Sequence, residues 1–212
     1  IDGIQCTFVV EGNTYRVHSP LIGRFNAENL LGVFSLLCAL GHPPADAVAL
    51  LERIGSPSGR MERFSYGDAK IFVDYAHAPD ALRNALSTLK EVTEGRLWVL
   101  FGSGGGKDPR RRAGMGAVAK ELADAVVLTA DNPRKEDPQK IVEDILASGV
   151  QVQFVELDRA KAIEKAIRAM GERDVMLVAG KGQEDFQIIG DKTFYLSDQA
   201  EVQRVIDELQ AR

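Results

Sequence analysis

The sequence predicts an α/β protein with a doubly wound, mostly parallel sheet. From about residue 70 onward, short apolar runs rich in β-branched residues alternate with amphipathic stretches of helical length. The apolar runs are nearly continuous, which is typical of parallel strands that are covered on both faces. Because strand-helix-strand crossovers are right-handed, this alternation places helices on both sides of one sheet.

The strands and helices follow from this alternation in order. We expect strands at 70–76, 96–102, 125–131, 152–157 and 174–180, and helices at 79–92, 108–123, 137–148 and 158–170. Asp108, Asp137 and Asp158 are predicted N-caps, since an Asp side chain accepts hydrogen bonds from the first helical turn. A proline follows the first two of them at the first helical position, where it is favoured.

Residues 1–59 have a different pattern. They predict a hairpin that turns at Gly12 and Asn13, followed by helices at 27–40 and 43–54 that end at Gly41 and Gly55. A piece of this size cannot bury its apolar helix alone. We therefore expect residues 1–59 to be the C-terminal part of a domain that begins upstream, and residues 60–212 to form a complete domain.

Composition excludes several classes of protein. With 212 residues, 45% hydrophobic and 27% charged, the chain reads as globular, and its net charge of -5 argues against general nucleic-acid binding. The longest apolar runs are far shorter than the about 20 residues of a membrane span. Cys6 and Cys38 lack C-x-x-C spacing, so we expect buried free thiols, no metal site and a reducing cytoplasm.

Four polar loops follow the predicted strands, in the sequences DYAHAPD, FGSGGGKDPRRR, ADNPRKEDP and AGKGQEDF. In doubly wound sheets, ligands bind beyond the carboxyl ends of the strands. The loops are therefore expected to meet at one ligand-binding edge.

The glycine-rich loop at 102–107 matches no standard nucleotide motif. Lys107 is followed by Asp108 rather than Ser or Thr, and it occupies the place of the last glycine of a dinucleotide fingerprint. The arginines at 110–112 lie in the first turn of the predicted helix, where the helix dipole is positive. Each exposed cation there destabilises the helix by about 0.3–1 kcal/mol, so an anion bound nearby would explain their presence. A solvated basic face is the alternative.

Two other loops predict the recognition of a free amino acid. Pro133 makes the turn after its strand rigid, so Asn132 and Arg134 are held in place, and the Arg guanidinium matches a carboxylate in a bidentate manner. Gly180 and Gly182 allow close backbone approach. Glu184 can pair with an ammonium group. The alternative for the first loop is a surface turn without a ligand. The alternative for His77 is a purely structural histidine. His18 and His42 receive no role.

Taken together and in order, six motifs resemble the Mur ligases of peptidoglycan synthesis: GRFNAENLLGVFSLLCALG, PSGRMERF, VDYAHAPDAL, FGSGGGKDPRRR, TADNPR and AGKGQEDFQIIG. The resemblance covers nearly the whole chain. It is strongest to the members that add meso-diaminopimelate to UDP-N-acetylmuramoyl-L-alanyl-D-glutamate. It implies the end of a P-loop ATPase domain in residues 1–59 and a Rossmann-like amino-acid-binding domain in residues 60–212.

The resemblance also implies residue roles. It places Asn26 and Asn29 near the adenine of ATP, Arg60 near the phosphates, Asp74 near the ribose and His77 beside the nucleotide. The residues that match the family's diaminopimelate site are Lys107, Asn132, Arg134, Gly180 and Glu184. Lys107 stands where the family usually has an arginine, and Gln183 stands where it commonly has a histidine. These two differences put the affinity for the amino acid in question.

The implied reaction is ATP-dependent amide formation through an acyl phosphate. The family's P-loop and Mg2+ ligands would lie upstream of Ile1, so no catalytic residue is assigned here and the chain alone is expected to be inactive. The expected partners are ATP, meso-diaminopimelate and the UDP-N-acetylmuramoyl-dipeptide; nucleic acid, membrane and a second copy are not expected. Alternatives are a non-catalytic binding module, or a related folylpolyglutamate or cyanophycin type of ligase.

Overall fold

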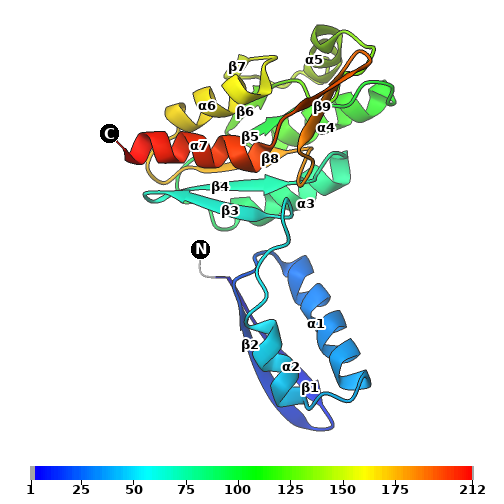
Figure 1. Ribbon diagram of the computed structural model, residues 1–212, viewed down its shortest axis with the longest axis vertical. Coiled ribbons are helices and arrows are strands. Elements are labelled where there is room, and N and C mark those ends of the chain that lie inside the picture. The colour runs from blue at the N-terminus through cyan, green and yellow to red at the C-terminus, as the bar shows by residue number, and fades with distance from the viewer. Residues whose placement is uncertain (1–2, 212) are drawn as a thin grey trace. The chain divides into compact units, whose positions relative to one another are not determined.

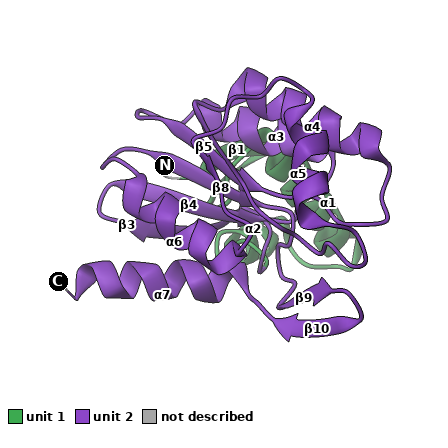
Figure 2. Ribbon diagram, turned by 90° about the horizontal axis from the view of Figure 1, so that it is seen from above, with its two compact units in different colours: residues 1–57 green, residues 58–212 purple. Residues whose placement is uncertain are grey.

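The computed structural model describes residues 3–211 and forms two compact units, Ile1–Pro57 and Ser58–Arg212 (Figures 1 and 2). No helix in the described part of the chain is long and apolar enough to span a membrane.

The first unit is a hairpin covered by two helices. Strands β1 (Ile4–Val10) and β2 (Asn13–Ser19) pair antiparallel, and α1 (Arg24–Ala39) and α2 (Pro44–Leu51) pack on them. Their shared core contains Phe8, Val17, Leu30, Phe34 and Leu51.

The predicted hairpin turn is wrong by one residue. Val10 pairs with Asn13, so the turn residues are Glu11 and Gly12, with φ of 51° and 80°. A two-residue turn of this hand needs positive φ at both positions, and glycine takes the second one without strain. The turn is therefore fixed by Gly12, and Asn13 already belongs to β2.

The two cysteines are free thiols, as predicted, although each is half-buried rather than buried. Cys6 and Cys38 pack at the margin of the first unit's core. Partial burial raises the pKa of the Cys6 thiol.

The second unit is built on a six-stranded sheet with the order β3-β4-β8-β5-β6-β7. The strands are β3 (Glu62–Tyr66), β4 (Ala69–Asp74), β5 (Leu97–Phe101), β6 (Ala125–Leu128), β7 (Phe154–Val155) and β8 (Val175–Ala179). Only β3 runs antiparallel to its neighbour. The predicted α/β class with a mostly parallel sheet is confirmed.

Helices cover both faces of this sheet (Figure 2). On one face lie α3 (Pro79–Lys90), α4 (Pro109–Leu122) and α5 (Pro138–Leu146), and on the other lie α6 (Arg159–Ala169) and α7 (Asp198–Gln210). The α6 and α7 face is a continuous apolar core that includes Val73, Leu100, Ile163, Val178 and Val205. All three predicted Asp N-caps accept a hydrogen bond from the first turn of their helices.

Three elements were not predicted from the sequence: β3, α7, and a hairpin of β9 (Phe186–Ile189) and β10 (Lys192–Tyr195). In addition, the strand expected at 152–157 is only two residues long. The hairpin is a separate two-stranded sheet, and it directly follows the loop at the end of β8.

Candidate functional site

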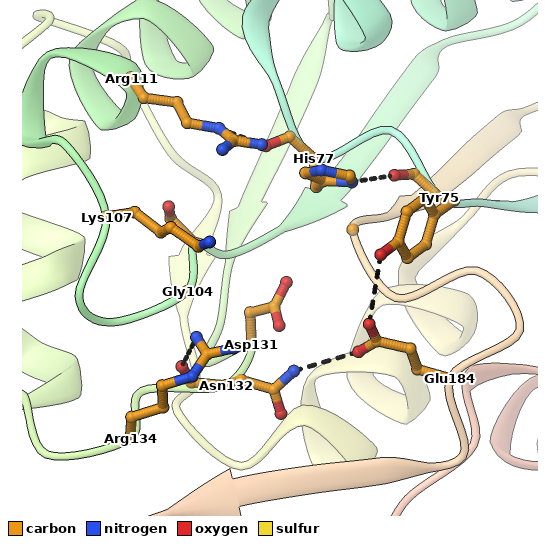
Figure 3. Close-up of a pocket in the computed structure, with 11 residues that line it drawn as sticks. Tyr75, His77, Gly104, Lys107, Arg111, Asp131, Asn132, Arg134 and Glu184 are labelled. Carbon is orange, nitrogen blue, oxygen red and sulfur yellow. Dashed lines mark hydrogen bonds between the residues drawn. The ribbon is translucent and has the colours of Figure 1, made fainter.

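The four predicted loops meet at the carboxyl ends of β4, β5, β6 and β8, where they line a pocket of about 120 Å³ (Figure 3). On the same measure a site for one water molecule needs roughly 10–15 Å³, so this pocket is much larger than a single water site. The described residues that line the pocket are Tyr75, His77, Ser103, Gly104, Lys107, Arg111, Asp131, Asn132, Arg134, Gly180 and Glu184. The sheet therefore brings together all five residues predicted to bind diaminopimelate.

The turn after β6 holds Arg134 in an unusual backbone conformation. Its φ is 53°, in the left-handed region that residues other than glycine seldom adopt. Such a conformation costs on the order of 1–3 kcal/mol and persists only where surrounding contacts impose it. Here the Arg134 N–H donates to Ile188 O at 3.0 Å, and Arg134 O accepts from Gly190 N–H at 2.6 Å.

The Arg134 side chain retains donors for a ligand. Nη1 donates to Gly105 O at 3.0 Å and, at 3.4 Å, to Asn132 O. Nε and Nη2 donate to no residue within 3–211. Since the guanidinium lines the pocket, this part of the planar fork can bind a carboxylate.

Glu184 is already held in place by the protein. Its carboxylate accepts from Asn132 Nδ2 at 3.1 Å and from Tyr75 Oη at 3.4 Å, and it lies 3.5 Å from the Lys181 ammonium. Figure 3 shows Asn132 between Arg134 and Glu184. The side-chain amide of Asn132 therefore holds the Glu184 carboxylate beside the turn that carries Arg134.

Asp131 adds a second carboxylate, to which the sequence analysis gives no role. Its side chain lines the pocket, and the residue is only 7% exposed. Among residues 3–211, no donor is hydrogen-bonded to its carboxylate. The charge of the buried Arg159 guanidinium attracts this carboxylate, but no described residue donates a hydrogen bond to it, so a ligand that brings an ammonium group can do so from the pocket.

The arginines after the glycine-rich loop have separate partners, so they do not form one anion site. Arg110 pairs with Asp108 at 2.8 Å, and the buried Arg112 pairs with Glu136 and Asp144 at 2.8 Å each. Only Arg111 lines the pocket, where its Nε donates to His77 O at 2.8 Å. Because helix α4 turns successive side chains to different directions, three consecutive arginines cannot face one ligand.

Of the residues implied to bind ATP, His77 lines the pocket, whereas Arg60 and Asp74 do not belong to the described lining. Asp74 accepts from the N–H groups of Met61 and Ala76 at 2.9 and 2.8 Å. Burial raises its pKa, while these hydrogen bonds and the charge of Arg60 oppose the rise.

Tyr75 links these residues to the pocket. The Arg60 guanidinium lies 4.7 Å from the centre of the Tyr75 ring, and the His77 ring meets it edge-on at 4.5 Å. His77 Nδ1 is 2.7 Å from Tyr75 O, which makes Nδ1 the donor.

Asn26 and Asn29 lie in the first unit, at the start of α1. Asn26 Nδ2 donates to Ile22 O at 2.8 Å, and Asn29 Nδ2 donates to Asn26 Oδ1 at 3.1 Å. The Asn29 side chain thus holds the Asn26 side chain in place.

Two glycines shape the loop that carries Glu184. Gly59 and Gly182 both have positive φ, 65° and 52°. A Cβ at Gly59 would lie 2.0 Å from the backbone nitrogen of Gln183, and one at Gly182 would lie 2.7 Å from Gly59 O. Only a pair of residues without side chains allows this contact.

Within residues 3–211, no group of three or more His, Cys, Asp or Glu side chains is placed to hold a metal ion.

Comparison with known proteins relates this site to a family. Residues 59–182 match the family model described as Mur ligase, glutamate ligase domain. The chain is 47% identical over 205 residues to the UDP-N-acetylmuramoyl-L-alanyl-D-glutamate--2,6-diaminopimelate ligase of Ralstonia nicotianae, covering 92% of this chain and 40% of that protein. The equivalent protein of Vibrio parahaemolyticus is 42% identical, with 96% and 42% coverage.

Solved structures agree with this comparison. A structure of UDP-N-acetylmuramoyl-L-alanyl-D-glutamate--2,6-diaminopimelate ligase matches 99% of this chain and 44% of its own, with a TM-score of 0.74 and 33% identity. A folylpolyglutamate synthase from Thermotoga maritima has a TM-score of 0.67 at 21% identity over 85% of this chain and 41% of its own, which shows a shared fold alone. This chain spans about two fifths of the length of the curated relatives that it matches. Since the family model covers more than half of its residues, the chain belongs to the Mur ligase family and contains that family's glutamate ligase domain.

Proposed function

We propose that this chain supplies the amino-acid site of an ATP-dependent ligase that adds meso-diaminopimelate to UDP-N-acetylmuramoyl-L-alanyl-D-glutamate. The observation that carries the proposal is the mixture of charges in one small pocket. Lys107 and Arg134 line it together with Asp131 and Glu184. An amino-acid head group, with an ammonium and a carboxylate on one carbon, complements both signs.

The choice of diaminopimelate over lysine rests on Arg134. A lysine side chain ends in an ammonium group alone, whereas diaminopimelate ends in a second ammonium and carboxylate pair. The free donors of Arg134 bind that extra carboxylate, and Asp131 and Glu184 accept from the ammonium beside it. The similarity to 2,6-diaminopimelate ligases supports this choice.

The contribution of these residues to the reaction is positioning. In the proposed reaction ATP converts the glutamate γ-carboxylate of the acceptor into an acyl phosphate, and an amine of diaminopimelate displaces the phosphate. Holding one end of diaminopimelate in the pocket directs the amine at its other end toward the acceptor. Such orientation makes the attack effectively intramolecular, which can account for a large share of the rate.

The residues near Tyr75 form the proposed nucleotide side of the site. We assign Arg60, Asp74 and His77 to the ATP side, together with Asn26 and Asn29 of the first unit. In this proposal residues 1–59 complete a central ATP-binding domain, whose phosphate loop and Mg2+ ligands lie in the part of the relatives that this chain does not span. Relatives of this fold include ligases solved with ADP.

Replacement of the Arg134 guanidinium tests the proposal. In the full-length protein that contains this chain, Arg134→Ala is expected to raise the KM for meso-diaminopimelate by about 10- to 100-fold, since hydrogen bonds to a charged group contribute about 1.5–3 kcal/mol. Any use of lysine should fall far less, because lysine lacks the second carboxylate. Steady-state assays of phosphate release with each amino acid measure both values.

The matched control is Arg173→Ala, which removes an exposed arginine whose nearest acidic partner is 3.9 Å away. It should leave both KM values unchanged. Equal losses with diaminopimelate and lysine in Arg134→Ala would contradict the proposed role.

A further inference from the structure

The β9–β10 hairpin lies against the turn that carries Asn132 and Arg134. Besides the two backbone hydrogen bonds to Arg134, the Ile188 N–H donates to Asn132 Oδ1 at 2.9 Å. Since Oδ1 is occupied in this way, Nδ2 of the same amide points to Glu184. The hairpin thus contacts both pocket-lining residues that follow Asp131.

The Gln187 side chain of this hairpin donates hydrogen bonds to the turn. It is only 8% exposed, although it lies on a strand of four residues. Its Nε2 donates to Asp131 O at 2.7 Å and, at the limit of hydrogen bonding, to Ala130 O at 3.5 Å. A buried amide at this place is favourable only because it satisfies the carbonyl of Asp131.

The hydrogen bond from Gln187 acts on Asp131, whose side chain lines the pocket. Asp131 has no regular strand partner for its carbonyl, because β6 ends at Leu128. The Gln187 amide takes the place of such a partner. Without it, the backbone at Asp131 could rotate, and the carboxylate of Asp131 and the guanidinium of Arg134 would lose their fixed separation.

We infer that Gln187 is a positioning residue, which holds the turn of Asp131, Asn132 and Arg134 in the conformation that binds the ligand. The identity of that ligand rests on the proposed function, whereas the effect on the turn does not. Gln187 itself does not belong to the described pocket lining. It acts through Asp131.

A merely structural role for Gln187 would give different experimental results from a positioning role. If Gln187 only satisfied a buried carbonyl, its loss would lower the melting temperature and leave the affinity of the folded protein for each substrate unchanged. A positioning role predicts a selective effect on the amino-acid substrate and a local effect on residues 129–137.

The test uses two variants of the full-length protein. Gln187→Met keeps the length of the side chain and removes the donor, and Gln187→Asn keeps a donor that is one methylene too short. Both are expected to raise the KM for meso-diaminopimelate about 5- to 10-fold, as the loss of one supporting hydrogen bond would, while the KM for ATP changes less than twofold. Hydrogen-deuterium exchange should accelerate in peptides that cover 129–137, with little change in α3 and α6.

Thr193→Ala is the matched control, since Thr193 lies on β10, is exposed and pairs with Ile188 of β9. It changes the hairpin without touching the turn, and neither measurement should move. If one glutamine variant fails to fold, the other decides.

Unchanged exchange at 129–137 in a folded glutamine variant would overturn the inference. So would equal increases in the KM for diaminopimelate and for ATP. If instead the unmodified protein does not use diaminopimelate at all, the proposed function fails, and the exchange measurement still decides on the role of Gln187.

Discussion

At the scale of single residues, the most informative side chain outside the pocket is Asp174, just before β8. Its carboxylate accepts from Arg96 N–H at 2.8 Å, Gly171 N–H at 2.9 Å and the Trp98 indole at 2.7 Å. Burial alone would raise its pKa, but these three hydrogen bonds and the charge of Arg96 bring the pKa below its ordinary value. The ionised form therefore stabilises the fold.

Asp174→Asn is expected to lower the free energy of unfolding by about 1.5–3 kcal/mol at pH 7, because hydrogen bonds to a charged acceptor are lost. A lowered pKa contributes stability above the ordinary carboxyl value of about 3.9, and this contribution disappears as the pH falls through the folded-state pKa. The difference between the two proteins should therefore shrink below about pH 4. Urea unfolding followed by circular dichroism measures it, and a difference that is constant with pH would contradict this role.

Residue identities in the pocket were predictable where a motif places them. Asn132, Arg134 and Glu184 follow strands in short polar loops, and the structure brings them together as expected. Asp131 occurs in the same motif, but its importance depends on the direction of its side chain, which the fold of the turn sets and no sequence pattern encodes. Their binding roles stay predictions.

At the scale of elements, helix starts were the most predictable features. The side chains of Asp108, Asp137 and Asp158 accept from Arg110, Gln139 and Lys161, respectively. A cap depends on a few neighbouring residues, so local sequence is sufficient to predict it. The β9–β10 hairpin is different, since its strands have four residues each, β10 is exposed throughout, and its contacts are with the distant Arg134 turn.

Replacement of Asp137 measures the contribution of one N-cap to the free energy of unfolding. Its side chain accepts from Gln139 N–H at 2.9 Å and is exposed, so few other contacts change on replacement. Asp137→Ala should lower the free energy of unfolding by about 1 kcal/mol, and Asp137→Ser, which preserves the cap, by much less. Urea denaturation compares the three proteins, and equal stability of the alanine and serine variants would show that the cap contributes nothing.

At the scale of the whole molecule, the structure divides into compact units between Pro57 and Ser58, and the domain boundary between residues 59 and 60 stays a prediction. The sequence shows this change because the strand-helix alternation begins only after it. The assignment of residues 1–59 to an ATP-binding domain stays a prediction, because the hairpin and two helices of the first unit do not by themselves identify a nucleotide site.

Residues 58–212 are expected to fold without the first unit, since their sheet, both helical layers and the pocket lining lie within that range. A fragment of these residues should unfold in one cooperative transition. It should also retain the Trp98 fluorescence of the complete chain, because the indole is buried and bonded to Asp174 within the same unit. A fragment with the emission of solvent-exposed tryptophan would contradict this independence.

The contact between Gly59 and Gly182 limits how the protein can be re-engineered. Attempts to admit a bulkier amino acid would naturally diversify the segment from 180 to 185. Any side chain at either glycine, even a methyl group, would displace the backbone beside Glu184 instead of enlarging the binding volume. Libraries that aim at altered substrate choice should keep both glycines and instead vary Ser103 and Lys107, which line the pocket from the loop after β5.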